Sequence, residues 1–577
     1  MQVQEAVKRA LGLTRSNVPE LPGALPILGH TVEFVRDTIA LLTRAQREMG
    51  EVAALRVAHL PMVAMFGPEA HQAVFRAPDT QLNPQEAYKI MTPVFGEGMV
   101  YDAPPDKMNE QLKMLLPALK DRRMRTYGEI IVKEVEDSIA DWGEEGELDL
   151  VDYCRVLTNF TSSHTLLGKE FREGMTDEFA RVYHDLERGV TPLAYLNAHL
   201  PIPSFRKRDQ ARVRLVEMIS EIVAERRHSG RQGEDFLQTM MDASYKSGAH
   251  LNDDEITGML LAAMFAGHHT SSVTTAWTLI ELLKSPQYLQ RMLGQLDATF
   301  GNEGEISYQA LRNIDLTENA VKEALRLHPP LFMLIRVVMQ PFSYKGIDMD
   351  PGTWIVISPT VSHRMGSVFP EPMRFDPDRF APPRLEDKQD YAFIPFGGGR
   401  HKCMGNAFAL LQVKAILAVL LRRFEFELVS SEVGEDFHGL VVGPTQPCRV
   451  RYRRRQRPTQ VDVPVEVAPK RTSEECPMTT AAETQEEVVA EPEAEAQPVA
   501  APGVGEGTAS YTVVVDLDLC QGHAVCAGEA PEVFDVGDDD KVQLLEPFPA
   551  ASLRDKVELA AEYCPTRAIR VIDGEAN

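Results

Sequence analysis

The hydrophobic and polar positions of this chain follow a helical spacing through about the first 430 residues. The long stretch of residues 253–283 is apolar on most sides, so it predicts a helix buried through the middle of a domain. We expect Asp253 or Asp254 to cap this helix and Pro286 to stop it.

Alternating apolar residues predict short strands near residues 52–66 and 342–358, where proline and glycine mark the turns. Another helix is indicated over residues 407–421. Because helical spacing dominates and strands are few and short, we predict a mainly α fold with a minor β-sheet for residues 1–455.

The composition changes at residues 456–506, which contain seven prolines and no aromatic residue. Such a segment cannot bury enough apolar surface to offset its ordering entropy, so we predict a disordered linker. A compact α+β pattern follows in residues 507–577, with a strand, a helix and a strand expected over 511–515, 553–563 and 568–572. The chain is therefore expected to hold two domains joined by a linker.

The net charge of −25 is concentrated at the C-terminal end. Residues 507–577 carry 14 acidic and 5 basic side chains, which makes nucleic-acid binding implausible. The arginines between Arg449 and Arg457 close the large domain; they suit a solvated strand end or, alternatively, a docking site for an acidic partner.

Seven cysteines are too few for a disulfide framework in 577 residues. We expect Cys154, Cys448 and Cys476 to be free thiols in a reducing cytoplasm. No apolar run reaches the ~18 residues that a spanning helix needs. The N-terminus has no apolar signal core, so we expect a soluble, untargeted protein with no transmembrane segment.

A glycine-rich segment contains the most informative cysteine, Cys403. It reads Phe-Gly-Gly-Gly-Arg-His-Lys-Cys-Met-Gly from Phe396 to Gly405. Glycines let a backbone approach a flat cofactor, and a cysteine thiolate can be the axial ligand of a haem iron. Taken alone, the segment also describes a tight turn before the helix at 407–421.

Two further motifs decide between these interpretations. Glu323 and Arg326 lie three residues apart on one predicted helical face, and Arg379 follows in a proline-held turn. A lone pair of this kind is normally a surface pair of little energetic weight. In this order before the cysteine segment, the motifs resemble those of cytochrome P-450 enzymes, from about Pro19 to Arg455.

The resemblance implies the family fold, a b-type haem with Cys403 as its proximal thiolate, and a buried structural pair of Glu323 and Arg326. Thiolate ligation favours O–O cleavage and therefore oxygen insertion into a C–H bond. His401 and Arg336 would bind the haem propionates, because charge-assisted hydrogen bonds suit carboxylates. The other implied haem-binding residues are Phe396 and Gly399.

The middle of the long helix contains Ala266-Gly-His268-His269-Thr270. The Thr270 hydroxyl can bond to a helix carbonyl or to bound oxygen, which makes a proton path possible. Many family members have a carboxylate immediately before this threonine, whereas here His269 would be the relay group. We therefore predict Thr270, His269 and His268 as catalytic residues.

The Gly-His-His-Thr-Ser-Ser segment and the segment from Tyr88 to Asp102 together resemble the two signatures of sterol 14-demethylases. The resemblance implies that Tyr88 bonds a propionate. It also implies a long apolar pocket for a four-ring sterol. Its predicted lining residues are Met91, Phe95, Tyr101, Ala266, Leu331 and Met333. Tyr101 stands where this family often has Phe or Leu, which leaves the C4-methylation state of the sterol open.

A second cysteine constellation lies in the C-terminal domain: Cys520 and Cys526, with His523 between them, and Cys564 before Pro565. Three soft ligands favour an iron–sulfur cluster over zinc, which normally takes a fourth ligand. The pattern resembles single-cluster ferredoxins in which His523 replaces the middle cysteine. We expect a [3Fe–4S] cluster, and a [4Fe–4S] form is not excluded.

These features predict a sterol 14α-demethylase fused to its ferredoxin. By resemblance, it would oxidise the 14α-methyl group of a sterol such as lanosterol in three O2-dependent rounds, releasing formate and leaving a 14,15 double bond. An NAD(P)H-dependent ferredoxin reductase would supply the electrons. The alternatives are hydroxylation of another bulky lipid or terpenoid, and a non-enzymatic haem and iron–sulfur redox sensor.

Overall fold

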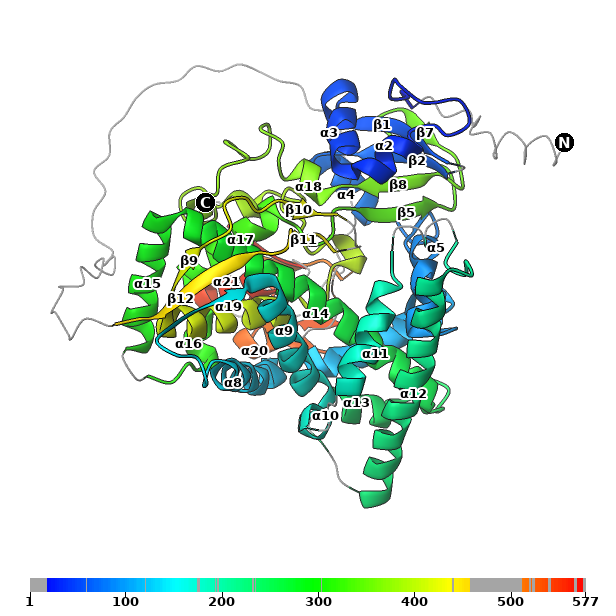
Figure 1. Cartoon of the computed structure of the whole chain (residues 1–577). Helices are drawn as coiled ribbons and strands as arrows, with labels where there is room; N and C mark the ends of the chain where they lie inside the picture. Colours follow the sequence, from blue (N-terminus) through cyan, green and yellow to red (C-terminus); the bar gives the residue numbers. More distant parts are fainter. Residues whose placement is uncertain are drawn as a thin grey trace, which may run out of the picture.

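In the computed structural model, the chain forms a large helical part and a small C-terminal part (Figure 1). The large part contains a sheet, at the upper right in this view. The described residues are 18–58, 60–119, 121–173, 177–191, 194, 197–230, 233, 235–301, 304–437, 441–456, 511–517, 520, 525–537, 541–564 and 568–573.

Helices form most of the large part, as the helical spacing predicts. The longer ones are α3 (Thr38–Met49), α4 (Pro68–Arg76), α7 (Pro105–Leu115), α8 (Asp121–Ser138), α9 (Leu150–Leu167), α11 (Asp177–Arg188), α12 (Pro203–Ser229), α14 (Asp253–Lys284), α15 (Pro286–Phe300), α17 (Asp315–Leu327) and α19 (Asn406–Arg423). The shorter ones are α2 (Thr31–Arg36), α5 (Gln85–Tyr88), α6 (Thr92–Phe95), α10 (Lys169–Glu173), α13 (Phe236–Asp242), α16 (Tyr308–Arg312) and α18 (Pro359–Ser362).

The predicted central helix is α14, and its N-terminus differs from the prediction. Asn252, not Asp253 or Asp254, is the cap: its side chain accepts from the backbone N–H of Glu255, whose carboxylate accepts from that of Asn252. The two aspartates lie in the first turn, where they complement the helix dipole. Pro286 begins α15 directly after the end of α14.

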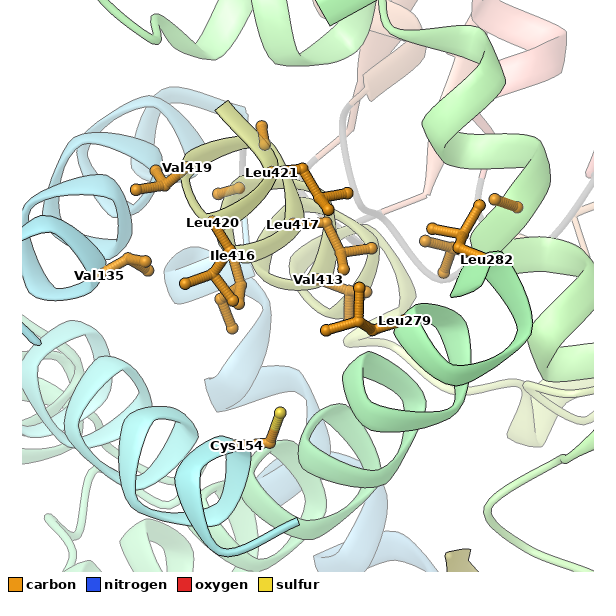
Figure 2. Close-up of a cluster of buried hydrophobic side chains, with 14 of the residues drawn as sticks. Val135, Cys154, Leu279, Leu282, Val413, Ile416, Leu417, Val419, Leu420 and Leu421 are labelled. Atoms are coloured by element: carbon orange, nitrogen blue, oxygen red, sulfur yellow. The ribbon is translucent and has the colours of Figure 1, made fainter. Parts of the chain in front are cut away.

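The largest hydrophobic core surrounds α19, which lies between α8 and α14 (Figure 2). Leu417 and Val413 of α19 point toward Leu279 of α14, and Val135 of α8 lies on the other side. Because α19 is apolar all round, it is buried by its neighbours on all sides. This core fixes the helix that follows Cys403.

The main sheet has the strand order β1-β2-β8-β5-β3. Its strands are β1 (Val52–Val57), β2 (Leu60–Met65), β8 (Trp354–Ile357), β5 (Leu334–Val338) and β3 (Leu82–Asn83). Only β2 and β8 pair in parallel among the described strand pairs. Two hairpins lie outside it: β6 (Phe342–Tyr344) with β7 (Ile347–Met349), and β10 (Glu435–Asp436) with β11 (Gly443–Pro444). The strands expected near residues 52–66 and 342–358 are thereby found.

A three-stranded sheet, β4-β12-β9, contains the basic end of the large part. Its strands are β4 (Glu145–Asp149), β12 (Arg449–Arg454) and β9 (Phe424–Leu428). Arg449 pairs with Glu147 of β4 at 3.1 Å, and Arg451 pairs with Glu427 of β9 at 3.1 Å. These arginines therefore have partners within their own sheet, in agreement with the solvated strand end.

The C-terminal part is a small α+β unit. It contains β13 (Tyr511–Val515) paired with β16 (Ile569–Asp573), β14 (Phe534–Val536) paired with β15 (Val542–Leu544), and the helices α20 (Val525–Glu529) and α21 (Arg554–Tyr563). The predicted strand, helix and strand are all present. The helix starts one residue later than expected, because residues 551–553 form a 3₁₀ turn.

Several predictions fall outside the described residues: the linker beyond Gln456, the Cys476 thiol, and the role of His523. In the part of the chain that the structure describes, no helix combines the length and apolar character needed to cross a membrane.

Candidate haem and iron–sulfur sites

The Cys403 segment is held by close backbone packing. Gly399 has φ +64°, and a Cβ there would lie 2.1 Å from the carbonyl oxygen of Phe75, so only glycine fits. The backbone N–H of Cys403 donates to the carbonyl of Phe396 at 2.9 Å. The sequence thus folds into a tight loop that presents the thiol at the start of α19.

The Cys403 side chain is accessible, yet burial raises the pKa of its thiol, and the Gly405 N–H and Lys402 only partly oppose this effect. A side chain that is accessible and also deep among protein atoms faces the interior of the domain rather than its outer surface. A metal ion bound at this sulfur would make it a thiolate.

Arg336, on β5, is the second feature that fits a haem. Its side chain is 8% exposed and donates to the carbonyl of Ile335 at 2.9 Å. Burial lowers the pKa of its guanidinium, and none of the carboxylates of the described residues forms an ion pair with it. A buried cation without an anionic partner is costly, so this position suits a carboxylate brought by a ligand, such as a haem propionate.

Tyr88 and Tyr101 lie together near this arginine, with ring centroids 5.0 Å apart. Burial raises the pKa of Tyr101 to about 12, with smaller effects from Tyr88, Arg336 and the Cys403 thiol. Burial also raises the pKa of Tyr88, which Arg336 opposes. The structure therefore brings together the predicted haem-binding Tyr88 and Arg336 and the predicted substrate-binding Tyr101.

His401 has a partner that the sequence did not indicate. Its Nε2 lies 2.7 Å from a carboxylate oxygen of Asp79. Lys107, on α7, pairs with Glu255 at 2.9 Å. Asp79 therefore orients the imidazole that was predicted to bind a propionate.

The distal segment lies in the middle of α14. The Thr270 hydroxyl donates to the carbonyl of Ala266 at 2.7 Å. A helix carbonyl is one of the two partners that the sequence predicts for this hydroxyl. Ala266 is exposed although α14 runs through the centre of the domain. Like Cys403, it is accessible although the residues on either side of it in the chain are half-buried.

His268 and His269 converge on a carboxylate that the sequence analysis missed, Glu187 of α11. Its Oε1 lies 2.8 Å from His269 Nε2 and 3.2 Å from His268 Nδ1. Burial would raise the pKa of Glu187, but the hydrogen bonds from both histidines outweigh it and lower the pKa to about 2.

The second nitrogen of His268 lies 2.9 Å from the carbonyl of Arg155, so both of its nitrogens face acceptors. His268 is 2% exposed, which makes it a fixed support for Glu187. His269 is more accessible and precedes Thr270. The ligand atoms of Glu187, His268 and His269 lie within 4.8 Å of one another, and here they form a hydrogen-bonded network.

The predicted substrate residues fall into separate places. Met91 and Phe95 are buried in one cluster, which Tyr101 joins. The rings of Phe95 and Phe265 lie 6.3 Å apart, and Phe265 is 5.8 Å from the ring of His269. Met333 instead packs against another cluster, formed by Ala87, Ile335 and Val337, and Leu331 is 38% exposed.

Glu323 and Arg326 form a fully buried ion pair at 2.8 Å. Arg379 binds both oxygens of Glu323 at 3.0 Å, and Arg326 also donates to the carbonyls of His363 and Pro372. One carboxylate thus joins two guanidiniums and the loop that precedes the Cys403 segment.

The three cysteines of the C-terminal part belong to one cluster of residues. Cys520 and Cys526 are buried, and burial raises the pKa of the Cys526 thiol to about 12, with smaller contributions from the nearby Cys564 and Cys520 thiols. Backbone N–H groups of Val542 and Ala568 point at the sulfurs of Cys520 and Cys564, at 3.4 and 3.3 Å. Three close thiols with N–H donors suit an iron–sulfur cluster.

Residues 19–450 match the family model described as "Cytochrome P450". The large domain belongs to the cytochrome P450 family. The P450 domain is therefore a haem-binding domain of a monooxygenase family. In the C-terminal part, residues 513–571 match the model of a "4Fe-4S single cluster domain".

Curated relatives agree with this family assignment. The chain is 42% identical over 447 residues to a "Sterol 14alpha-demethylase" of Mycolicibacterium vanbaalenii, covering 76% of this chain and 98% of the relative. It is 38% identical to a "Sterol 14-demethylase" of Arabidopsis thaliana, covering 76% of this chain and 91% of the relative.

Among solved structures, a retinoic-acid-bound cyanobacterial CYP120A1 has a TM-score of 0.68 at 21% identity, covering 76% of this chain and 100% of the other. This similarity confirms the predicted mainly α P450 fold of the large domain.

Proposed function

We propose that the protein is a sterol 14α-demethylase that receives electrons from its own ferredoxin domain. It would oxidise the 14α-methyl group three times with O2, releasing formate and a sterol with a 14,15 double bond. The observation that carries this proposal is the 42% identity across 98% of a sterol 14α-demethylase. The fused iron–sulfur domain supports the electron source.

The haem, when bound, supplies the oxygen-activating chemistry that a thiolate ligand favours. Cys403 would hold the iron, and the loop containing Phe396 and Gly399 would fix its sulfur. Arg336 and Tyr88 would bind the propionates, together with His401, which Asp79 orients at 2.7 Å.

Proton supply would involve Thr270 and His269, supported by the buried Glu187. The Glu187 carboxylate lies 2.8 Å from His269 Nε2 and would orient this imidazole to pass a proton toward the Thr270 hydroxyl. His268 would act through Glu187 rather than on the substrate, because both of its nitrogens are already engaged.

The sterol would bind against residues of α14 and the segment that follows α5. Met91, Phe95 and Tyr101 share one apolar cluster, and Ala266 offers accessible surface. Leu331 and Met333 would contact the substrate from the segment before β5. An apolar lining with few polar groups suits a four-ring sterol.

The cluster would be a [3Fe–4S] centre on Cys520, Cys526 and Cys564, since the domain supplies three thiolates at one place. An NAD(P)H-dependent ferredoxin reductase would reduce it. The reducing compartment in which these thiols persist would be the cytoplasm.

Incubation of the purified full-length protein with lanosterol, a ferredoxin reductase, NADPH and O2 tests the proposal. Mass analysis should find a sterol lacking the 14-methyl carbon, and Cys403→Ala should yield none. A product that has gained oxygen and kept every carbon would instead favour hydroxylation of the lipid. Unchanged sterol, with no shift of the Soret band on sterol titration, would contradict the proposal.

A further inference from the structure

An ion pair joins the two domains of this chain. Arg312 Nη2, on α16 of the P450 domain, lies 2.7 Å from Glu529 Oε1, on α20 of the ferredoxin domain, 217 residues later. The side chains are 20% and 19% exposed, whereas the surface pair Arg374 and Glu371 is 66% and 70% exposed. A partly enclosed pair interacts more strongly than one open to solvent.

Glu529 lies at the border of the iron–sulfur site. It ends α20, three residues after Cys526 and therefore on the same helical side. The carbonyl of Cys526 accepts a hydrogen bond from the backbone N–H of Ala530 at 2.9 Å, which holds this turn. Arg312 consequently binds the ferredoxin domain close to one of its cluster thiols.

Arg312 lies on the side of the P450 domain that holds Cys403. Its helix, α16, packs against α8 and α19, and α19 begins three residues after Cys403. The guanidinium lies over the ring of Tyr308 on the same helix, 6.0 Å from its centroid. In Figure 1, α16 and the orange helix α20 both lie in the lower left part of the molecule.

The two domains also come close to each other at the end of α4. Asp516, four residues before Cys520, is close enough to Arg76 to raise the pKa of its guanidinium, after the larger effect of a hydrogen bond to Tyr391. Phe75, the neighbour of Arg76, packs directly on Gly398 and Gly399 of the Cys403 loop. Both contacts thus adjoin elements next to Cys403: α4 packs on its loop, and α16 packs on α19.

The basic strand β12, the other candidate for docking an acidic partner, is engaged elsewhere. Arg449 and Arg451 pair with glutamates of their own sheet, and Arg455 pairs with Asp297 at 2.6 Å. The ferredoxin domain has a surplus of acidic side chains, 14 against 5 basic ones over residues 507–577, so a basic contact on the P450 domain favours its approach.

We propose that Arg312 and Glu529 form the docking contact that holds the ferredoxin domain against the Cys403 side of the P450 domain for electron transfer. The inference rests on the proposed function for the direction of electron flow. In this step one electron leaves the reduced cluster and reduces the ferric haem iron, with no bond made or broken. An external reductant, such as dithionite or a ferredoxin reductase, then reduces the cluster again.

Charge reversal in the full-length protein tests the contact. Arg312→Glu and Glu529→Arg each place like charges together, whereas the double variant restores an opposite pair. The matched controls are Arg374→Glu and Glu532→Arg, which change the charge of each domain equally; Glu532 pairs with Lys556 inside the ferredoxin domain.

Two readouts are needed. Hydrogen exchange of α16 and α20 reports docking without any turnover, and stopped-flow reduction of the haem under carbon monoxide reports electron transfer. Each single reversal should raise exchange and slow haem reduction by about 10-fold, and the double variant should recover most of both. Haem reduction should not depend on protein concentration, because the contact lies within one chain.

Single variants that match the two controls, a double variant no better than the singles, or reduction that speeds up with protein concentration would overturn the docking contact. None of these assays contains sterol. A failed docking test therefore leaves the demethylase proposal intact. Conversely, the docking result can be interpreted even if the protein does not turn over sterol.

Discussion

Glu187 of α11 and His269 of α14 meet with an Oε1–Nε2 distance of 2.8 Å, one residue before Thr270. The contact joins a buried carboxylate, whose pKa lies at about 2, to the histidine that precedes this threonine. An acidic group thus reaches the distal segment of α14 from another helix. Glu187 is a positioning residue, since it acts through His269.

Replacing Glu187 by Gln should remove the carboxylate that orients His269 beside Thr270. We expect product formed per electron consumed to fall by about 10-fold. The sterol-induced Soret shift should persist. Measuring product and NADPH oxidation together checks this.

The matched control is Glu178→Gln, also on α11, which changes an exposed pair with Arg214. It should leave the coupling of electrons to product unchanged. Equal coupling in Glu187→Gln and Glu178→Gln would remove Glu187 from the proton path.

Replacing Glu323 by Gln should destabilise the P450 domain strongly, because Arg326 and Arg379 would remain buried without their shared anion. We expect a loss of about 3–5 kcal/mol in the free energy of unfolding. Glu371→Gln breaks an exposed pair of the same spacing and should cost no more than about 0.5 kcal/mol. Urea denaturation of both variants measures this; similar losses would show that the buried network adds little.

The stability of the P450 domain should fall with pH below about 6.5, partly through His71. Burial lowers the pKa of this imidazole from 6.5 to about 4, although a hydrogen bond to the carbonyl of Tyr391 opposes the effect. In this window the unfolded chain binds a proton that the folded chain does not. The contribution is therefore complete above pH 6.5 and is lost toward pH 4, by up to about 3 kcal/mol.

The variant His71→Gln should show a smaller loss of stability between about pH 7 and about pH 5 than the parent protein. Exposed His228→Gln is the control. Carboxylates such as Glu187 and Glu318, with pKa values of about 2, lose their contribution only below their ordinary pKa of 4.5, so they do not enter this range. If the free energy of unfolding of His71→Gln changed with pH as steeply as that of the parent protein, His71 would have no part in the pH dependence.

Arg336→Met should weaken haem retention, because the buried guanidinium is placed to receive a propionate. We expect lower haem content after gel filtration, and partial recovery in Arg336→Lys, which keeps the charge. Lys345→Met, at an exposed turn next to the same domain's sheet, should retain haem fully. Normal haem content in Arg336→Met would contradict the assignment.

The sequence alone was informative wherever a signal is local. The stretch of residues 253–283, apolar on most sides, predicts α14 to within one residue at its C-terminal end, because its helical spacing is continuous. The cap was placed one or two residues too late, since three consecutive acidic or amide side chains, Asn252 to Asp254, can each cap a helix. Backbone geometry, not residue type, selects Asn252.

Contacts between distant segments could not be predicted from the sequence. Glu187 lies 81 residues before His268, in an amphipathic helix with several other acidic residues, and only the packing of α11 against α14 selects it. The pairing of Asp79 with His401 spans 322 residues and has no sequence signal at all. Met333 likewise packs against the cluster of Ala87, Ile335 and Val337 rather than against the cluster that contains Met91.

The fate of the 14α-methyl carbon tests the central claim most directly. A sterol carrying isotope only in that methyl group should be incubated with the full-length protein, a ferredoxin reductase, NADPH and O2. The account predicts one labelled formate for each sterol consumed and an unlabelled sterol with a 14,15 double bond. Label that stays in the sterol while NADPH and O2 are consumed would contradict it.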